Sequence, residues 1–449
     1  MQEIPSGKDM PGISVIGLGK LGACAAACFA SKGFSTIGVE IDQACVDSVN
    51  RGLAPVQEPG LQEFMDRAGD RLAATPDYRR AFEESDITFL IVPTPSREDG
   101  HFSNEFLEHA LERLSLALKD SLKKYHLFVV SSTVSPGSIN GKLIPLVEAV
   151  SCRKLNRDFG FCYNPEFIAL GSVIKDTLNP DMVLIGQSSP EAGDRVEEIY
   201  RVLCENTPYI ARMSITSAEV AKIGLNAYVT MKISFANTLA SICEKVAGTE
   251  IDKITDALGA DKRISPYYLK GGLMFGGPCF PRDNRAFAAF TGQYGIEASL
   301  ANATDQVNQC RRDILINRIL AHVRTHKCRA VSLLGLTYKP GTPVMDESPA
   351  IPVIRELLKN GLDVTVYDPL AMDNARKIFK DDISYSGSIG ECIACSNTCV
   401  VMTNDNAFIN MELEYFRGGP RTVIDCWRIL GQTGDLENVE YIALGEHTT

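Results

Sequence analysis

Residues 13–42 read ISVIGLGKLGACAAACFASKGFSTIGVEID, and their pattern is the clearest indication of the fold. An apolar run, a glycine-rich turn, a helix of small residues and a second apolar run form the pattern of a strand–helix–strand unit. Gly17, Gly19 and Gly22 have G-x-G-x-x-G spacing directly after the first apolar run. The first glycine permits the turn, the second lets main chain approach a pyrophosphate, and the third packs helix on strand. We therefore expect a dinucleotide-binding unit rather than a glycine-rich turn that binds nothing.

The end of the second apolar run indicates which dinucleotide is bound. Glu40 stands there, and a carboxylate at this place accepts hydrogen bonds from the ribose hydroxyls. It would repel a 2′-phosphate, so the sequence favours NAD over NADP. Asp42 is a nearby alternative for the same role.

The rest of the chain predicts a two-part α/β protein with a helical middle. Apolar runs at 87–93 and 126–133 alternate with helical patterns, which favours a parallel sheet covered on both faces. From Ser214 one long helical stretch follows, with Thr216 and Glu219 at capping-box spacing and Gly248 as its expected end. More helical pattern runs to about residue 325, and strands resume at 330–340, 363–369, 399–404 and 422–427. The expected fold is two Rossmann-like doubly wound domains, 1–212 and 326–449, joined by a central helical domain, 213–325.

Composition excludes several classes of function. The 449 residues carry a net charge of −11, which argues against a nucleic-acid or anionic-membrane partner. No apolar run approaches the roughly 18 residues of a membrane span, and the first ten residues lack the apolar core of a signal peptide. Fourteen scattered cysteines indicate reduced thiols in a cytoplasm. Residues 391–399, ECIACSNTC, have no histidine or fourth cysteine nearby, so we expect buried cysteines there and no metal site.

The stretch GGPCFPRDN, residues 276–284, puts a thiol in what we expect to be an irregular loop. Cys279 could be a nucleophile, a metal ligand, half of a disulfide or a core filler. A metal-ligand role for Cys279 lacks partner ligands, and a disulfide does not suit a reduced compartment. A thiol near Arg282 and Asp283 suits a thiolate that reaches a substrate. Together with NAD, it suggests oxidation of an aldehyde through a thiohemiacetal and a thioester.

Three further positions could carry chemistry. Lys222 and Asn226 are four residues apart and share one face of the long helix, in an otherwise apolar segment. A solvated helix face is the equally open alternative. Glu166 follows a proline in a turn-like loop, where a carboxylate is more often only solvated. Lys339 lies at the expected end of a strand, where α/β sheets bind ligands.

At this point the motifs match a known family. The chain resembles the UDP-glucose/GDP-mannose dehydrogenases from about Ile13 to about Leu430, with these segments in family order: VIGLGKLG, NRGLAPVQEPGL, VPTPSREDG, SSTVSPGS, NPEFIALGSVIKD, AKIGLNAY, RISPYYLKGGLMFGGPCFPRD and GLTYKPGT. The resemblance implies that a nucleotide sugar is oxidised twice, from primary alcohol to carboxylate, with two NAD+ and a water. UDP-glucose is the expected substrate. GDP-mannose, a UDP-N-acetylhexosamine and a non-catalytic relative that binds NAD or a nucleotide sugar are the alternatives.

The resemblance also implies roles for individual residues. Cys279 would trap the aldehyde, Lys222 would assist proton transfer and stabilise oxyanions, and Glu166 would act on the hydrolytic water. The remaining catalytic positions are Asn226, Asp283 and Thr133. The implied cofactor contacts are Gly17, Leu18, Gly19, Lys20, Leu21, Gly22, Glu40, Pro93, Thr94, Thr133 and Arg282. The implied substrate contacts are Glu166, Lys222, Asn226, Arg263, Tyr267, Leu269, Phe275, Gly276, Tyr338 and Lys339.

Arg263 would reach into a neighbouring subunit, so the resemblance implies a homodimer or larger homo-oligomer built on the long helix. Domain 1–212 would bind NAD, domain 213–325 would carry the dimer contact and the catalytic loop, and domain 326–449 would bind the nucleotide sugar.

The chain departs from the family pattern at a few positions. Cys45, Leu170 and Asp346 stand where the family contacts the cofactor, and Trp427 falls on the nucleotide-sugar side, with Arg428 displaced by one. Asp346 puts an anion in place of a cation near the expected phosphates. We therefore expect weaker binding unless another lysine or arginine compensates.

Overall fold

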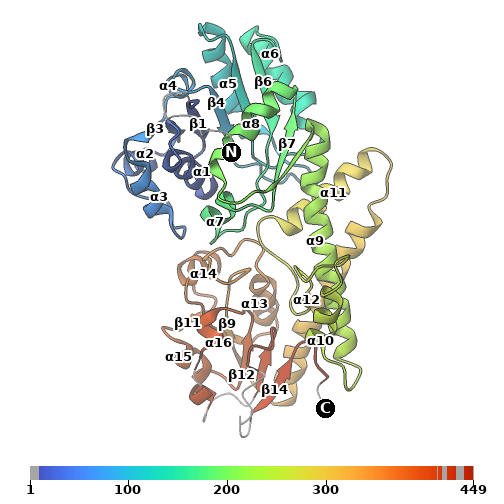
Figure 1. The fold of residues 1–449 in the computed structure, drawn as a ribbon. Helices are drawn as coiled ribbons and strands as arrows, with labels where there is room; N and C mark the ends of the chain where they lie inside the picture. The colour runs from blue at the N-terminus through green and yellow to red at the C-terminus, as the bar shows by residue number, and fades with distance from the viewer. Residues whose placement is uncertain (1–9, 412, 417–421, 431–438, 448–449) are drawn as a thin grey trace. The chain divides into compact units, whose positions relative to one another are not determined.

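The computed structural model describes residues 10–411, 413–416, 422–430 and 439–447. The chain forms two compact units, Met1–Gly224 and Leu225–Thr449, each with its own sheet of mostly or entirely parallel strands (Figure 1). The boundary between them falls within α9, Ile215–Cys243. The predicted fold class, two α/β parts and a helical middle, is confirmed. The three-domain boundaries stay a prediction.

The sheet of the first unit has eight strands in the order β3-β2-β1-β4-β5-β6-β7-β8. Neighbouring strands are parallel, except that β7 runs antiparallel to β6. In chain order the strands are β1 Ile13–Ile16, β2 Thr36–Val39, β3 Leu72–Thr75, β4 Ile87–Leu90, β5 His126–Val130, β6 Phe159–Tyr163, β7 Met182–Gln187 and β8 Tyr209–Ser214. The helices are α1 Lys20–Ser31, α2 Gln43–Asn50, α3 Leu61–Ala68, α4 Tyr78–Glu83, α5 Glu105–Asp120, α6 Ile144–Ser151, α7 Val173–Leu178 and α8 Pro190–Leu203, with short helical turns η1 Gly69–Arg71 and η2 Ile139–Leu143.

Both faces of this sheet are buried, which is why its strands read as continuous apolar runs. On β5, Leu127 and Val129 join a core with α1, α3, α7 and α8. Phe128 and Val130 point the other way, into a core with α4, α5 and α6. Successive side chains of a strand alternate between faces, so one run of four apolar residues fills both layers.

The sheet of the second unit has six parallel strands in the order β11-β10-β9-β12-β13-β14. In chain order these are β9 Ala330–Leu334, β10 Asp363–Tyr367, β11 Ser384–Tyr385, β12 Thr398–Val401, β13 Thr422–Asp425 and β14 Glu440–Ala443. Helices α12 Ser299–Thr325, α13 Ala350–Lys359 and α14 Met372–Phe379 pack on one core, and α15 Ile389–Ala394 and α16 Asn406–Ile409 pack on another with η3 Leu413–Phe416. Ahead of the sheet come α10 Ile251–Gly259 and α11 Phe280–Gln293.

Four local predictions were wrong. The long helix ends at Cys243 rather than Gly248, and Gly248 lies in a later turn with φ +80°. Thr216 and Glu219 form no capping box, because the Ser214 hydroxyl accepts from the Ser217 amide and so caps α9 itself. β9 stops before Gly335, which leaves Lys339 on the following loop. In the 391–399 segment, Cys392 and Cys399 are buried as expected, but Cys395 is exposed.

Candidate active site

The glycine turn of the first unit has the geometry that a dinucleotide requires. Gly17 has φ +92°, and a Cβ there would come within 2.6 Å of the Ile91 carbonyl oxygen. A Cβ at Gly22 would meet the Gly17 carbonyl oxygen at 1.8 Å. Gly19 differs, because a Cβ there would meet no protein atom within 4 Å. It stands at the N-terminus of α1, whose main-chain N–H groups and dipole favour phosphate. Two glycines thus serve the chain's own packing, and the third leaves open space for a diphosphate.

Glu40 and Asp42 are clearly distinguished by their contacts. The Glu40 carboxylate accepts from the amides of Leu18, at 2.9 Å, and Ile41, at 2.7 Å, which holds it beside the glycine turn. Asp42 instead accepts from the Ala44 amide at 2.9 Å and caps α2. Glu40, rather than Asp42, therefore lies beside the glycine turn, where the ribose contact was predicted.

Other predicted cofactor residues lie at the carboxyl ends of β4 and β5. The Thr94 hydroxyl donates to the Thr133 carbonyl oxygen at 2.6 Å, so the structure brings these two together. Thr94 is buried and Pro93 is exposed. In the glycine turn, Leu18 is buried, whereas Lys20 and Leu21 are half-buried.

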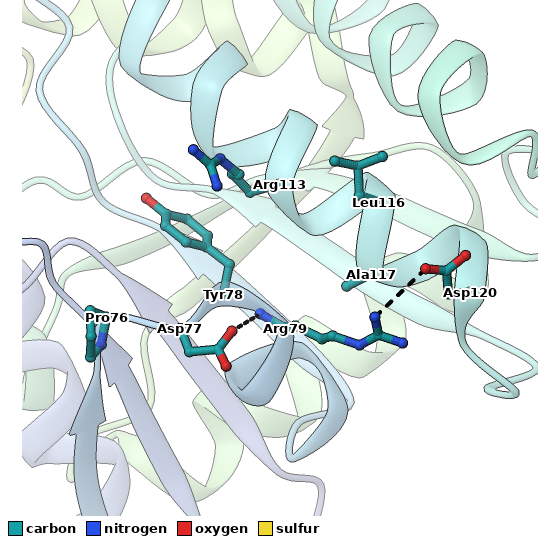
Figure 2. A pocket seen from close by; sticks show the side chains of 8 residues that line it. All are labelled: Pro76, Asp77, Tyr78, Arg79, Arg113, Leu116, Ala117 and Asp120. Atoms are coloured by element: carbon teal, nitrogen blue, oxygen red, sulfur yellow. Dashed lines mark hydrogen bonds and ion pairs between the residues drawn. The ribbon is translucent and has the colours of Figure 1, made fainter.

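A shallow cavity of about 250 Å³ lies between α4 and α5 of the same unit. Figure 2 shows its lining: Pro76, Asp77, Tyr78, Arg79, Arg113, Leu116, Ala117 and Asp120. Arg79 pairs with Asp120 at 3.7 Å, and Asp77 caps α4. Burial and the Glu40 carboxylate raise the pKa of Tyr78, although Arg113 opposes the rise. None of its lining residues was predicted as a site residue.

Glu166 and Lys222 meet in the first unit. Glu166 lies in the loop between β6 and α7, as predicted, and the buried Lys222 ammonium donates to its main-chain oxygen at 2.6 Å. The ammonium also lies 4.4 Å from the centre of the Phe167 ring. These contacts show that Lys222 is not on a solvated helix face. Burial raises the pKa of the Glu166 carboxyl to about 7, although the Tyr200 hydroxyl and Lys222 oppose the rise.

Asn226, Asp283 and Arg282 meet in the second unit. The Asn226 amide on α9 donates to the Asp283 carboxylate at 2.6 Å, and both side chains are buried. The Arg282 guanidinium lies 3.3 Å from the same carboxylate. Asp283 therefore bonds to a neutral donor and to a cation at the start of α11.

The irregular loop predicted at residues 276–284 ends at Cys279, because residues 280–284 belong to the start of α11. The exposed Cys279 is the N-cap of α11, and its carbonyl oxygen accepts from the Asp283 amide at 2.8 Å. Pro281 suggested a loop, but proline in a first helical turn is tolerated because that amide has no partner there. The thiol thus stands where helix N–H groups favour a negative charge.

The two glycines before Cys279 allow close contact within the second unit. A Cβ at Gly276 would come within 2.2 Å of the Glu347 carbonyl oxygen, and one at Gly277 within 2.5 Å of the Tyr338 ring. The segment that ends at Cys279 is thereby packed on the loop that carries Tyr338 and Lys339. Arg263 lies apart, with its side chain 87% exposed and paired with Asp261 at 2.6 Å.

The other predicted substrate residues differ in burial. Leu269 and Phe275 are buried, and Tyr267 is 76% exposed.

Several residues that hold this arrangement were not predicted. The Tyr200 hydroxyl lies within hydrogen-bond distance of two acceptors, the Asn164 side-chain oxygen at 2.7 Å and the Glu166 carboxylate at 3.2 Å, and its one proton can be donated to either. Asn237 on α9 accepts from the Gly272 amide and donates to the Leu273 oxygen. The only feature of the sequence that could have indicated Tyr200 and Asn237 is that each is a polar residue within an apolar segment.

Asn308 on α12 forms a similar pair of bonds further along the segment. It accepts from the Phe275 amide at 2.8 Å and donates to the Phe275 oxygen at 3.0 Å. Asn237 and Asn308 together hold the main chain that leads to Cys279.

The departures from the family pattern have structural explanations in part. Cys45 and Leu170 pack against the apolar core of the first unit. Trp427 donates its indole N–H to the Met402 oxygen at 2.9 Å, and Arg428 pairs with Asp252 at 2.8 Å. Asp346 is exposed, as is Arg285, which pairs at 3.0 Å with the neighbouring Glu347 and so brings a cation to this loop.

Comparisons with known proteins agree with these features. Models of the UDP-glucose/GDP-mannose dehydrogenase family match along the chain: the NAD binding domain at residues 11–204, the central domain at 216–310 and the UDP binding domain at 332–432. The chain is 36% identical over 430 residues to UDP-glucose 6-dehydrogenase AglM of Haloferax volcanii, covering 95% of this chain and 98% of that protein. It is 32% identical over 413 residues to GDP-mannose 6-dehydrogenase of Pseudomonas aeruginosa, covering 89% and 93%.

A solved structure extends the likeness to the fold. The UDP-glucose dehydrogenase from the hyperthermophilic archaeon Pyrobaculum islandicum superposes with a TM-score of 0.89 at 28% identity, over 99% of this chain and 100% of that one. Among the residues described, no helix joins the length and the apolar character that a bilayer span needs.

Proposed function

The chain belongs to the UDP-glucose/GDP-mannose dehydrogenase family and is an NAD-dependent nucleotide-sugar dehydrogenase, and on this premise we propose that it oxidises UDP-glucose to UDP-glucuronate. Relatives named as UDP-glucose 6-dehydrogenases support this substrate. GDP-mannose is the second candidate, because other relatives of similar identity are named as GDP-mannose 6-dehydrogenases.

One observation carries the proposed chemistry: an exposed thiol at the N-terminus of α11, one helical turn ahead of the buried pair of Asp283 and Asn226. Cys279 adds as thiolate to the carbonyl carbon of the sugar aldehyde and gives a thiohemiacetal. Loss of a hydride from that carbon gives a thioester, and water then releases the carboxylate and the free thiol. Bound NAD+ supplies the hydride acceptor for both oxidations.

Glu166 is proposed to take a proton from the attacking water. A carboxyl group whose pKa is raised to about 7 is poised for this exchange near neutral pH. Lys222 is proposed to stabilise the oxyanion of each tetrahedral species, since a buried ammonium acts strongly where water is excluded. Asp283 and Asn226 are proposed to position the water and the oxyanion, and Thr133 to lie near the reacting centre.

The remaining site residues are proposed to bind the ligands. For NAD these are Gly17, Leu18, Gly19, Lys20, Leu21, Gly22, Glu40, Pro93, Thr94, Thr133 and Arg282. For the nucleotide sugar they are Glu166, Lys222, Asn226, Arg263, Tyr267, Leu269, Phe275, Gly276, Tyr338 and Lys339.

A homodimer built on α9 is part of the proposal. Tyr228, Phe235 and Ile242 recur every seven residues along this helix and are about half exposed, at 56%, 53% and 49%. An apolar stripe of this kind favours burial against a second copy of the helix. The side chain of Arg263 is exposed, as expected of a residue proposed to reach the substrate site of a neighbouring subunit.

A cytoplasmic location is also proposed. All fourteen cysteines lie in the part of the chain that the structure describes, and none of them forms a disulfide. This many cysteines without a disulfide suit a reducing compartment.

The test is the number of NADH formed per sugar. UDP-glucose, GDP-mannose and UDP-N-acetylmannosamine are each offered to the wild type, to Cys279→Ser and to Cys310→Ser, which changes another exposed thiol. We expect two NADH per UDP-glucose, and a loss of at least about a thousandfold in kcat for Cys279→Ser alone. If GDP-mannose rather than UDP-glucose gave two NADH, GDP-mannose would replace UDP-glucose as the proposed substrate. An unaffected Cys279→Ser enzyme would overturn the proposed thioester on Cys279.

A further inference from the structure

Two histidines and a glutamate outside the active site converge in the second unit. Residues 322–326 read HVRTH, so His322 and His326 stand four residues apart at the end of α12. Glu440 is the first residue of β14. One ligand atom from each of the three lies within 4.8 Å of the other two. Two histidines at this spacing on a helix, joined by a carboxylate, are a ligand set that divalent transition metals favour.

The distances suit a single ion. The Glu440 Oε2 atom lies 3.5 Å from His322 Nδ1 and 3.7 Å from His326 Nε2. Ligands at about 2.1 Å from a tetrahedral metal stand about 3.4 Å apart, so small side-chain rotations would complete the contact. The fourth position would be open to water, because His326 and Glu440 are about half exposed.

The surroundings hold these groups in place. Thr422 lies opposite Glu440 in the β13–β14 register, and its hydroxyl donates to the same Oε2 atom at 3.2 Å. Second contacts of this kind orient a metal ligand. The two imidazole rings stack with their centres 4.2 Å apart. Both rings thereby present a nitrogen to one carboxylate.

A plain ion pair between Glu440 and protonated histidines is the competing explanation. Burial and the neighbouring His326 lower the pKa of His322, although Glu440 opposes this. A metal requires the neutral form of each imidazole, whereas the ion pair requires the protonated form. The positions of the three ligand atoms suit the metal, and the binding experiment below separates the two explanations.

We propose that His322, His326 and Glu440 form a structural site for Zn²⁺ or a similar divalent transition metal, which fastens β14 to α12. β14 is the edge strand of the six-stranded sheet and pairs with β13. An ion held between it and the end of α12 ties that edge to the helix covering one face of the sheet. The site is separate from the proposed catalytic residues and serves the stability of the second unit.

The test measures Zn²⁺ binding by titration calorimetry and thermal unfolding on the full chain after removal of metal by a chelator. We expect one Zn²⁺ per chain and a rise in Tm of at least about 3 °C at saturating metal. His326→Ala and Glu440→Gln should each weaken binding at least about tenfold and abolish the rise in Tm. His109→Ala is the matched control, because His109 is exposed on α5 in the other unit.

Other outcomes would overturn the proposal. No saturable binding, with a lower Tm for both variants in the absence of metal, would mean that the cluster is only an ion pair. Equal binding by the variants would mean that Zn²⁺ binds elsewhere. Co²⁺ tests whether cysteines bind the metal instead. A thiolate charge-transfer band in the absorption spectrum of the Co²⁺-loaded protein would show capture by thiols rather than by this site.

Discussion

At Glu166 a carboxyl group sits in surroundings that oppose its ionisation. Its pKa is raised to about 7 by burial, and the Tyr200 hydroxyl and Lys222 limit the rise. A proton-accepting role requires the carboxylate, which is lost as the pH falls through the pKa. We therefore expect kcat for thioester hydrolysis to fall about tenfold per pH unit below about 7. Single-turnover kinetics from pH 5.5 to 8.5 would measure this limb, and Glu166→Gln should remove it.

Tyr200→Phe gives a sharper test of the same group. The variant loses a hydrogen bond that favours the carboxylate, so the pKa of Glu166 should rise and the acid limb should move to higher pH. Tyr441→Phe is a control in the other unit, where that hydroxyl bonds to Asp425. An acid limb that stays in place in Tyr200→Phe would show that Glu166 does not set it.

Single residues differ in how far the sequence could predict them. Gly22 meets Gly17, and Glu40 bonds to Leu18 and Ile41, all within one strand–helix–strand unit, so a local motif suffices. Tyr200 reaches Glu166 across 34 residues, and that contact exists only after β6 and α8 have packed. No local pattern encodes a partner at such a distance.

At the scale of elements, Asn308 joins α12 to the segment that leads to Cys279. Asn308→Ala would leave the Phe275 amide and oxygen without these bonds. We expect stability to fall by about 2 kcal/mol and kcat to fall at least about tenfold, because the thiol loses its supported position. Urea unfolding and steady-state kinetics would measure both. Asn302→Ala, an exposed change on the same helix, should alter neither; a normal kcat in Asn308→Ala would contradict the positioning role.

Glu219 joins α9 to the turn η2. Its buried carboxylate accepts from the amides of Gly137, at 2.6 Å, and Ile139, at 3.0 Å. Glu219→Ala leaves both amides without that acceptor, so we expect the free energy of unfolding to fall by about 3 kcal/mol. Ser217→Ala, at an exposed position on the same helix, loses only the hydroxyl bond to Ser214 and should be much less destabilising. Equal urea midpoints for the two variants would contradict this account.

The ends of the helices show why predictions from local sequence patterns were wrong at some positions. Glu219 looked like part of a cap for its own helix, yet it serves another element brought near by the fold. Pro281 looked like a loop residue, yet the first turn of α11 tolerates it. Strand and helix types were predictable because burial on both faces demands apolar runs. Helix ends depend on which distant groups arrive there.

At the scale of the whole molecule, the proposed dimer can be tested through α9. Phe235→Glu puts a charge in the middle of the exposed apolar stripe, where it would have to be desolvated on association. We expect the dimer dissociation constant to rise at least about a hundredfold, measured by sedimentation velocity over a range of concentrations. Leu300→Glu, an exposed apolar position on α12, is the control. An unchanged dimer would place the interface elsewhere.

The main chain before Cys279 has a further consequence for how this protein can diverge. Asn237 and Asn308 form hydrogen bonds with main-chain amide and carbonyl groups, and every amino acid except proline has both groups. At residues 273–275, one buried apolar side chain can therefore replace another over generations while the path of the backbone, and with it the position of the thiol, is inherited unchanged. Gly272 is fixed, because a Cβ there would come within 2.9 Å of the Cys426 carbonyl oxygen. A protein built in this way can change its proposed sugar contacts without first moving Cys279, its proposed nucleophile.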